Sequence, residues 1–384
     1  MHAPTAIPSG LVSPYAFWDA FLVRNSAYFV GEEYDNIWRV SSNVSVSLGS
    51  GDFMPLTTAT HTGNGNAFVW SKLLDAELAS VDVRVRVGTS FGVVEAAFKL
   101  EQSAPDIAPG SRSTVGLCGI MYPSDVHLLR AWSAYWELLG VDEFFLYWRG
   151  PPEKLSELED VAKQLKHASV TFIQWGNVSR LPQQVSLNSC WRRFGRAHTY
   201  LMNYDLDEYL VLEPMGVSIA DFFDALKPAT WAAVVSDSNW AELDYAAINT
   251  TYDRMELRHL GAAPFKRISQ GSGGRVKWTA HMERAFPVAP LVDVHELFKG
   301  DNSGHPNAAP GPGGLLGDLG PGAEAKPLQY FIPRALGRHF HLANAKQYPR
   351  DVGGEDMWSY DVGLRSLVMR NTMNVSAARE KQWA

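Results

Sequence analysis

The feature that most constrains the fold is an alternation of apolar runs and helical segments between residues 115 and 212. The apolar runs have the length of strands and occupy residues 115–122, 142–148, 169–175 and 198–212. The intervening segments repeat apolar residues at helical spacing and occupy residues 124–140, 152–168 and 181–195, with Gly140 and Gly195 at two of their ends. Strands that alternate with helices form a mostly parallel sheet with right-handed crossovers. The pattern therefore predicts an α/β fold.

The chain divides into three parts around this pattern. Residues 1–112 predict a β-rich N-terminal domain, with short strands at 43–49, 66–74, 80–88 and 91–100. Residues 113–350 predict the α/β domain, which continues with a helix at 218–227 and strands at 231–240, 277–286 and 290–300. A Gly/Pro-rich stretch at about 300–323 predicts a long loop, and residues 351–384 predict a tail that ends in a helix.

Composition excludes several classes of protein. A net charge of −7 argues against a nucleic-acid partner, which normally requires a basic surface. No run of about 18 apolar residues predicts a membrane anchor, and the first residues lack the basic start of a signal peptide. Cys118 and Cys190 are the two cysteines, so a disulfide framework and a Cys-rich zinc site are excluded. One bridge between them and two buried thiols both remain open.

The sequence "NYDLDEYLVL" places two acids, Asp205 and Asp207, in an otherwise apolar run. In a strand, residues i and i+2 point to the same side, so both carboxylates are predicted to project together. At the carboxyl end of a strand in an α/β sheet, that side opens into the ligand crevice. A divalent cation would remove the repulsion between the two carboxylates, and Mg²⁺ or Mn²⁺ takes such oxygen ligands together with substrate phosphates.

Three interpretations of this D-x-D pattern compete. Both acids can be solvated in a surface turn, or the first can be the nucleophile of a phosphatase-like fold. In phosphatases of that kind the motif comes early and is followed by Thr or Val, whereas Glu208 follows here. The third interpretation is a nucleotide-sugar transferase, and the position of the motif after three strand–helix units favours it.

Several segments, in order, resemble glycosyltransferase family 92, within the wider GT-A fold. These are "LLGVDEFFLYW", "VTFIQW", "QQVSLNSCWRRF", "YDLDEYLV", "KWTAHMERAFPVAPLVDVHE" and "GRHFHLANAKQY", which together cover roughly residues 115–350. In the third segment the matching positions are Gln184, Asn188, Cys190 and Arg193. Two stretches depart from the family: "WRGPPE" replaces a polar Asp-Asn-x-Ser stretch, and "SNWAELDYAA" replaces Phe-Gly-Ser near the expected acceptor.

The resemblance implies a Rossmann-like GT-A domain that transfers a sugar from a nucleotide-sugar donor, most simply a UDP-sugar, to a glycan or glycoconjugate acceptor with inversion. It implies Mn²⁺ or Mg²⁺ as the cofactor. It also implies the Golgi lumen or secretory pathway, whereas the lack of a recognised signal or anchor leaves the cytoplasm open.

The resemblance also implies roles for individual residues. Asp205 and Asp207 are expected to hold the metal and the donor diphosphate, and a distant His is expected to complete the site. The candidates for that His are His295 and His339, with His341 as the alternative to His339.

Donor and acceptor contacts complete the expected site. Asn188, Arg193 and Lys277 are expected to contact the donor, although Arg193 is also placed to bond a nearby acid. Asp237, Glu242 and Asp244 flank the strand end where the acceptor is expected, and of these Asp237 or Glu242 is expected to be the base that deprotonates it.

Two functions of other classes remain as alternatives. The N-terminal domain and the 13 Trp residues are compatible with a carbohydrate-binding protein whose transferase domain is degenerate. A D-x-D phosphotransfer enzyme is the second. Release of phosphate from a simple phosphomonoester would identify it.

Overall fold

The computed structural model describes residues 15–33, 44–55, 60–61, 67–89, 92–103, 114–175, 182–212, 217–226, 231–236, 238–247, 249–254, 256–257, 265–269, 276–285, 328–332, 337–342 and 358–359. In this part of the chain, no helix is both long and apolar enough to span a bilayer.

The elements described up to residue 103 are all strands. They are β1 (Tyr15–Val23), β2 (Ser26–Glu33), β3 (Val44–Leu48), β4 (Met54–Pro55), β5 (Thr60–His61), β6 (Ala67–Leu73), β7 (Ser80–Thr89) and β8 (Gly92–Glu101). Strands β3, β6, β7 and β8 lie where the sequence predicts them. The strands form two four-stranded sheets, in the orders β1-β2-β6-β5 and β4-β3-β7-β8.

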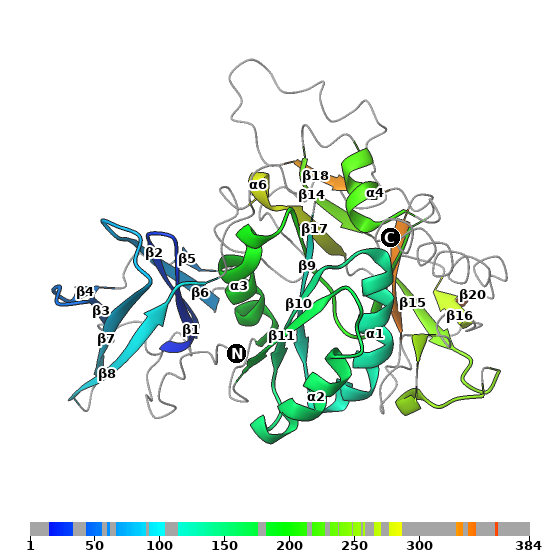
Figure 1. The fold of residues 1–384 in the computed structure, drawn as a ribbon, viewed down its shortest axis with the longest axis horizontal. Helices are drawn as coiled ribbons and strands as arrows, with labels where there is room; N and C mark the ends of the chain where they lie inside the picture. The colour runs from blue at the N-terminus through cyan, green and yellow to red at the C-terminus, as the bar shows by residue number, and fades with distance from the viewer. Residues whose placement is uncertain are drawn as a thin grey trace, which may run out of the picture.

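Strand β1 is buried on both of its faces, because its alternate residues enter two different cores. Ala20 and Leu22 pack in one core with Val83 and Val85 of β7. Phe21 and Val23 pack in a second core that also contains residues of the α/β part, among them Trp191. The sheet β1-β2-β6-β5 is therefore packed between the sheet β4-β3-β7-β8 and the α/β part (Figure 1). The second core lies between the sheet β1-β2-β6-β5 and the α/β part.

A seven-stranded mixed sheet forms the centre of the α/β part, in the order β11-β10-β9-β12-β17-β14-β18. Its strands are β9 (Val115–Met121), β10 (Glu143–Trp148), β11 (Ser169–Gln174), β12 (Tyr200–Asn203), β14 (Trp231–Ser236), β17 (Lys277–His281) and β18 (Leu328–Phe331). Strands β9 to β12 are parallel, as predicted, whereas β17 is antiparallel to both of its neighbours.

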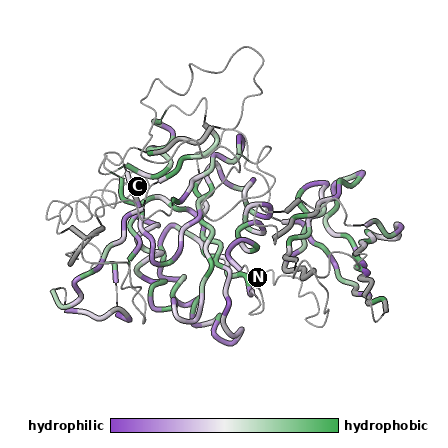
Figure 2. The backbone as a smooth tube through the Cα atoms, turned by 180° about the vertical axis from the view of Figure 1, so that it is seen from behind, coloured by the Kyte–Doolittle hydropathy of each residue, from purple (hydrophilic) through white to green (hydrophobic). Residues whose placement is uncertain are grey.

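Helices cover both faces of this sheet. They are α1 (Val126–Leu139), α2 (Leu155–Ala162), α3 (Pro182–Phe194), α4 (Ile219–Ala225) and α6 (Met282–Ala285), with short 3-10 turns at Pro123–Asp125, Pro152–Lys154, Gly195–Ala197 and Tyr252–Arg254. Helices α1 and α2 cover one face, and α3 lies between the other face and the N-terminal sheet (Figure 1). Figure 2 shows apolar strands through the middle of this part and hydrophilic segments along its edges.

Strand β9 shows why both faces of the central sheet must be buried under helices. All seven of its residues are buried, with Val115 and Leu117 on the α1 side and Cys118 and Ile120 on the α3 side. A continuous apolar run is the expected sequence for a strand buried in this way. Gly140 ends α1 in the left-handed conformation at φ 107°, which glycine adopts without the steric cost of a side chain.

A second, five-stranded sheet has the order β13-β19-β15-β16-β20. Its strands are β13 (Glu208–Leu212), β15 (Ser238–Leu243), β16 (Phe265–Ser269), β19 (Gly337–Leu342) and β20 (Trp358–Ser359). The single strand predicted at 198–212 is therefore wrong, because β12 belongs to the central sheet and β13 to this one. The strand predicted at 231–240 divides in the same way into β14 and β15.

The other predictions for this part have mixed outcomes. Helix α4 forms where it is predicted, with the Ser218 hydroxyl accepting a hydrogen bond from the backbone N–H of Asp221. The segment predicted as a strand at 277–286 is a strand only to His281 and continues as α6. The predicted strand at 290–300, the Gly/Pro-rich loop and the helix at the end of the tail lie outside the described residues.

Candidate functional site

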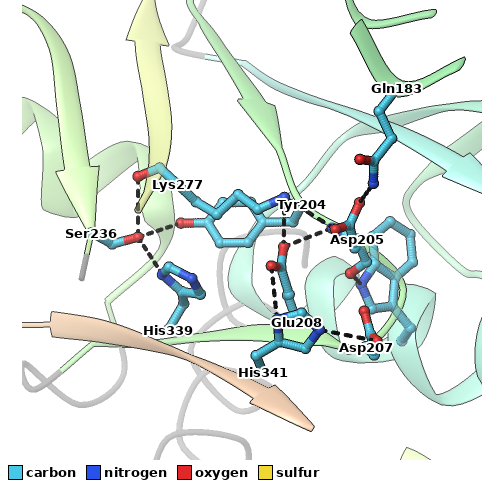
Figure 3. A network of polar contacts seen from close by, with 10 residues as sticks. Gln183, Tyr204, Asp205, Asp207, Glu208, Ser236, Lys277, His339 and His341 are labelled. Carbon is cyan, nitrogen blue, oxygen red and sulfur yellow. Dashed lines mark hydrogen bonds and ion pairs between the residues drawn. The ribbon is translucent and has the colours of Figure 1, made fainter. Parts of the chain in front are cut away.

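The D-x-D residues lie in a turn between two sheets. The backbone carbonyl of Asp205 accepts hydrogen bonds from the Glu208 N–H at 3.0 Å and from the indole N–H of Trp132 at 2.9 Å. After the turn, the carbonyl of Asp207 accepts from the N–H of Leu342 at 2.8 Å and so begins the pairing of β13 with β19. The expectation that both carboxylates share one side of a strand is therefore wrong, and each side chain has its own partners (Figure 3).

A cleft lies beside this turn, at the point where the strand order of the central sheet reverses. Strands β10 and β11 follow β9 on one side, and β12 lies on the other. The cleft is open to solvent, and its walls are formed by Cys118, Gly119, Ile120, Tyr147, Gln183, Ser186, Leu187, Asn203 and Asp205. Ligands of open α/β sheets bind at such switch points, so the cleft is the candidate ligand site.

Asp205 connects the cleft to a buried ion pair. Its Oδ1 accepts a hydrogen bond from Nε2 of Gln183 at 3.2 Å, and its Oδ2 lies 3.3 Å from Nζ of Lys277. The Asp205 side chain is 19% exposed, whereas Lys277 is fully buried. Asp205 is therefore the member of the D-x-D pair that faces the cleft.

Lys277 is neutralised within the protein. Besides Asp205, its Nζ contacts Oε2 of Glu208 at 2.9 Å, and the same oxygen accepts the backbone N–H of Asp205 at 2.8 Å. Burial disfavours the ammonium, but the nearby charges of Asp205 and Glu208 outweigh this effect and raise the pKa of Lys277. The sequence predicted that Lys277 contacts a donor phosphate. In the structure its ammonium instead pairs with Asp205 and Glu208 and so holds the D-x-D turn.

Asp207 faces away from Lys277 and contacts His341. Its Oδ2 lies 3.1 Å from Nε2 of His341, and both side chains are 2% exposed. The other ring nitrogen, Nδ1, lies 3.5 Å from Oε1 of Glu208. The indole of Trp240 stacks on the imidazole at 4.1 Å between ring centroids. Figure 3 shows Asp207 and Glu208 at the two ring nitrogens of His341, and together with the stacked Trp240 they fix the orientation of the ring.

His339 lies two residues earlier on β19 and has different partners. Its Nδ1 and the Ser236 hydroxyl are 2.9 Å apart, and that hydroxyl is also 2.9 Å from the Tyr204 hydroxyl. The Tyr204 ring packs edge-on against the imidazole at 5.6 Å. Of the two alternatives for the metal-binding His on this strand, His341 is therefore the one that the structure brings to Asp207.

Glu242 lies on the same face of the second sheet as His341. Trp240 pairs with His341 in the parallel register of β15 and β19, and its ring stacks on that histidine. Glu242 follows two residues later, so it projects to the same side. Asp244 instead accepts the N–H of Ala247 at 3.1 Å. Asp237, the other candidate base, lies outside the described residues.

The donor contacts expected from α3 differ from what the structure shows. Asn188 is fully buried, and its amide donates to the backbone carbonyl of Gln184 at 2.8 Å. Arg193 forms an ion pair with Asp19 of β1 at 2.7 Å, which is the bond to a nearby acid that its position also predicted. Neither residue is part of the cleft wall.

Sequence reasoning missed three residues of the site. Glu208 directly follows the D-x-D pattern, and Gln183 precedes the Gln184 that carries the family resemblance. Trp240 lies in the segment that departs from the family. The position of Glu208 next to Asp207 was a signal for its part in the same turn, whereas the contact with Lys277 at a sequence distance of about 70 residues had no local signal.

A divalent cation such as Mg²⁺ or Mn²⁺ requires several oxygen or nitrogen ligands that converge on one point. Among the described residues, no group of three His, Cys, Asp or Glu side chains is arranged to hold a metal ion, and His295 lies outside these residues. Asp207 Oδ2 and His341 Nε2 are 3.1 Å apart, close to the roughly 3.0 Å between adjacent ligands at about 2.1 Å from one Mg²⁺-sized ion. A carboxylate and an imidazole suit such a cation, with further ligands supplied by substrate phosphates and water. The pair is hydrogen-bonded as it stands, and it fits a cation site with two protein ligands once Nε2 of His341 carries no proton.

Comparison with known protein families identifies the class of enzyme. Residues 111–270 match the model of Glycosyltransferase family 92, a segment that contains β9 to β16 and therefore the D-x-D turn and the cleft. The match covers less than half of the chain and confirms the resemblance over these residues, whereas the last two resembling segments, from residue 277 on, lie beyond it. It supports a glycosyltransferase. No curated protein matches the chain.

Solved structures show only distant likeness. The apo structure of the bifunctional glycosyltransferase WbbM has 9% identity and a TM-score of 0.26, covering 50% of this chain and 37% of that chain. A β-glucuronidase from Parabacteroides merdae has 13% identity and a TM-score of 0.19, covering 48% of this chain and 26% of its own. An amylomaltase from Corynebacterium glutamicum has 12% identity and a TM-score of 0.13, covering 37% and 22%. The chain thus spans well under two thirds of each.

Proposed function

We propose that this glycosyltransferase is metal-dependent and transfers a sugar from a nucleotide-sugar donor to a hydroxyl group of a glycan or glycoconjugate, with inversion. The observation that carries the proposal is the contact between Asp207 and His341 at 3.1 Å, in the same turn as Asp205, which lines the cleft at the switch point of the sheet. This carboxylate–imidazole pair suits Mn²⁺, with Mg²⁺ as the alternative.

Asp207 and His341 would hold the cation. When bound, it would neutralise the charge that develops on the leaving diphosphate. Asp205 faces the cleft and would align the donor through its carboxylate. Its position is fixed by Gln183 and Lys277. The carboxylates of Asp205 and Glu208 already neutralise Lys277, so its role is to hold the turn rather than to bind a phosphate.

The acceptor would lie along the face of the second sheet that carries Trp240 and Glu242. A carboxylate placed against the attacking hydroxyl can take its proton in the transition state. Glu242 is partly buried on the same side as the cation pair, which supports it as the base. Asp237 remains the alternative.

The donor is proposed to be a UDP-sugar bound in the cleft, and the compartment is proposed to be the secretory pathway. A disulfide joins Cys118 of β9 to Cys190 of α3, so one bridge forms where the sequence also allowed two thiols. Structural disulfides persist in oxidising compartments and are rare in the cytosol, which supports the secretory location over the cytoplasmic alternative.

A thermal-shift screen of nucleotide sugars with and without Mn²⁺ tests the proposal, because a ligand that binds only the folded state raises the melting temperature. We expect one or more UDP-sugars to raise it only in the presence of Mn²⁺, and Asp207→Asn to remove the effect. Stabilisation by free glycans alone would favour the carbohydrate-binding alternative. Release of phosphate from a phosphomonoester, without binding of sugar nucleotides, would favour a phosphotransfer enzyme.

A further inference from the structure

Helix α3 lies between the cleft and the N-terminal sheet and contributes to both. Its first turns supply Gln183, Ser186 and Leu187 to the cleft wall. Further along the helix, Ser189 and Arg193 contact Asp19, a residue of β1. The helix therefore connects a strand near the N-terminus with the cleft through side-chain contacts.

Asp19 is a buried carboxylate with two side-chain partners on α3. It is 1% exposed, its Oδ1 accepts a hydrogen bond from Nη2 of Arg193 at 2.7 Å, and its Oδ2 accepts the hydroxyl proton of Ser189. A buried charge requires such partners, because desolvation of an unpaired carboxylate is costly. The three residues thus form one buried polar unit across the contact between β1 and α3.

The unit extends to the wall of the cleft through Tyr147. The Tyr147 hydroxyl is 2.7 Å from Oγ of Ser189. A serine has one hydroxyl proton, and Ser189 donates it to Asp19, so Tyr147 must be the donor to Ser189. Burial, and next the charge of Asp19, raise the pKa of Tyr147, which keeps its hydroxyl protonated for this role. The hydrogen bonds therefore run in one direction, from Tyr147 through Ser189 to Asp19.

Tyr147 has few ways to move while these contacts are made. Its ring packs edge-on against Trp175 at 4.9 Å, and its side chain is 1% exposed. It is also one of the residues that line the cleft, together with Asp205. The orientation of Tyr147 in the cleft wall thus depends, through Ser189, on the carboxylate of Asp19 in the N-terminal sheet.

We propose that Asp19 is a positioning residue of the donor cleft, acting through Ser189 on Tyr147. The N-terminal sheet, which carries Asp19, is therefore required for full donor binding. The inference rests on the proposed function, since it takes the cleft as the place where the nucleotide sugar binds. The N-terminal sheets bury a core of their own, but β1 also shares a second hydrophobic core with α3, which supports the same conclusion because it fixes β1 against the helix.

The test uses two variants of the full chain that break the connection but keep the ion pair between Asp19 and Arg193. These are Ser189→Ala and Tyr147→Phe. The probe is UDP in the presence of Mn²⁺, and its binding is measured by calorimetry. We expect each variant to weaken binding by about fivefold or more, at the lower end of common coupling between sites. Both changes break the same connection, so the double variant should have about the same UDP affinity as the single variant with the lower affinity.

Ser133→Ala is the matched control. Ser133 is a buried serine of α1 whose hydroxyl donates to the Leu129 carbonyl at 2.7 Å, and it is not part of the cleft wall. This variant should bind UDP as the wild type does. Equal weakening in the control would show that loss of any buried hydroxyl produces the effect, and would overturn the proposal. Ser189→Thr, which keeps the hydroxyl, should restore binding.

Hydrogen exchange in the absence of ligand separates this inference from the proposed function. We expect Ser189→Ala to speed amide exchange at residues 145–148 and 184–187, on the two walls of the cleft, relative to Ser133→Ala. If wild type fails to bind UDP but exchange rises at these walls, the proposed donor is wrong and the positioning role stands. If neither exchange nor binding changes in Ser189→Ala, the positioning role is wrong even though the proposed function is retained.

Discussion

Nζ of Lys277 lies 2.9 Å from Oε2 of Glu208, and neither side chain reaches solvent. The same carboxylate oxygen accepts the backbone N–H of Asp205, so this ion pair fixes the first residue of the D-x-D turn. Lys277 begins β17 in the central sheet and Glu208 begins β13 in the second sheet. The pair therefore joins the two sheets at the point where the candidate site lies.

Replacement of Lys277 should destabilise the fold. Lys277→Met leaves the Glu208 carboxylate buried without its cation, and breaking a buried pair in this way typically costs about 3–5 kcal/mol. We expect a loss of this size in the free energy of unfolding, measured by denaturant titration. The double variant Lys277→Met with Glu208→Gln should recover part of it, because it removes the unpaired charge. A loss below about 1 kcal/mol in the single variant would contradict a buried ion pair, since exposed pairs contribute about that much or less.

The two histidines of β19 should respond differently to Mn²⁺. His341 contacts Asp207, whereas His339 is bonded to Ser236. We expect His341→Ala to weaken Mn²⁺ binding, measured by titration calorimetry with UDP present, by at least about tenfold, the range seen when a metal site loses a supporting contact. His339→Ala is the matched control from the same strand and should retain Mn²⁺ affinity. The reverse result would assign the ligand to His339.

The alternation of strands and helices was readable from the sequence because it depends on local patterns. The run from Val115 to Met121 is apolar at nearly every position, as a strand covered on both faces requires, and Gly140 marks the end of α1. The same reasoning failed at residues 198–212, where a mostly apolar run contains a turn. The two adjacent strands belong to different sheets and each is buried on both faces, so no polar alternation marks the boundary; the polar residues Asn203, Asp205, Asp207 and Glu208 gather at the turn itself.

The candidate site could be predicted only in part, because local sequence patterns predict only its local features. Asp205 and Asp207 stand out locally, whereas their partners come from β17 and β19, which are distant in the sequence. Arg193 was expected to contact the donor, but it bonds to Asp19, which lies about 170 residues earlier in the sequence. Pairings over such distances are set by the packing of the sheets, and no local periodicity encodes them.

Glu242 should affect the chemical step more than donor binding. It lies on the His341 face of the second sheet but is not part of the cleft wall. Glu242→Gln removes the base while keeping the size of the side chain, and general-base catalysis typically contributes 10²–10⁴-fold. We expect kcat to fall by about a hundredfold or more, with the affinity for the nucleotide sugar within about twofold of wild type. Asp244→Asn is the control from the same segment. If Glu242→Gln keeps its kcat, Asp237 becomes the candidate.

The disulfide should contribute strongly to stability. Cys118 and Cys190 are separated by 72 residues, and a bridge that closes a loop of this length stabilises the fold by about 4 kcal/mol in the chain-entropy model. We expect dithiothreitol to lower the free energy of unfolding of wild type by about this amount in a denaturant titration. The double variant Cys118→Ala with Cys190→Ala should already show the loss and should not respond to the reductant. A response of the double variant would point to an effect unrelated to the bridge.

Stability should fall at alkaline pH, and Tyr135 should account for part of the loss. Tyr135 is buried, and its hydroxyl donates to the Leu210 carbonyl at 2.7 Å. Burial, and next the nearby Tyr204, raise its pKa above the usual 10.0. A group whose pKa is raised on folding contributes stability that is present below its unfolded pKa and is lost as the pH rises through its folded pKa. Above about pH 10, each such group makes the free energy of unfolding fall by about 1.4 kcal/mol per pH unit.

Tyr135→Phe removes one of these groups, so the slope above pH 10 should become shallower by about that amount. The free energy of unfolding, measured between pH 8 and pH 11, gives the slope directly. The variant is expected to be less stable than wild type at pH 8, because it loses the hydrogen bond to Leu210. Phe144→Leu is the control, since it disturbs the same core without removing a titratable group and should keep the wild-type slope. Equal slopes in wild type and Tyr135→Phe would show that Tyr135 ionises as readily in the folded chain as in the unfolded one.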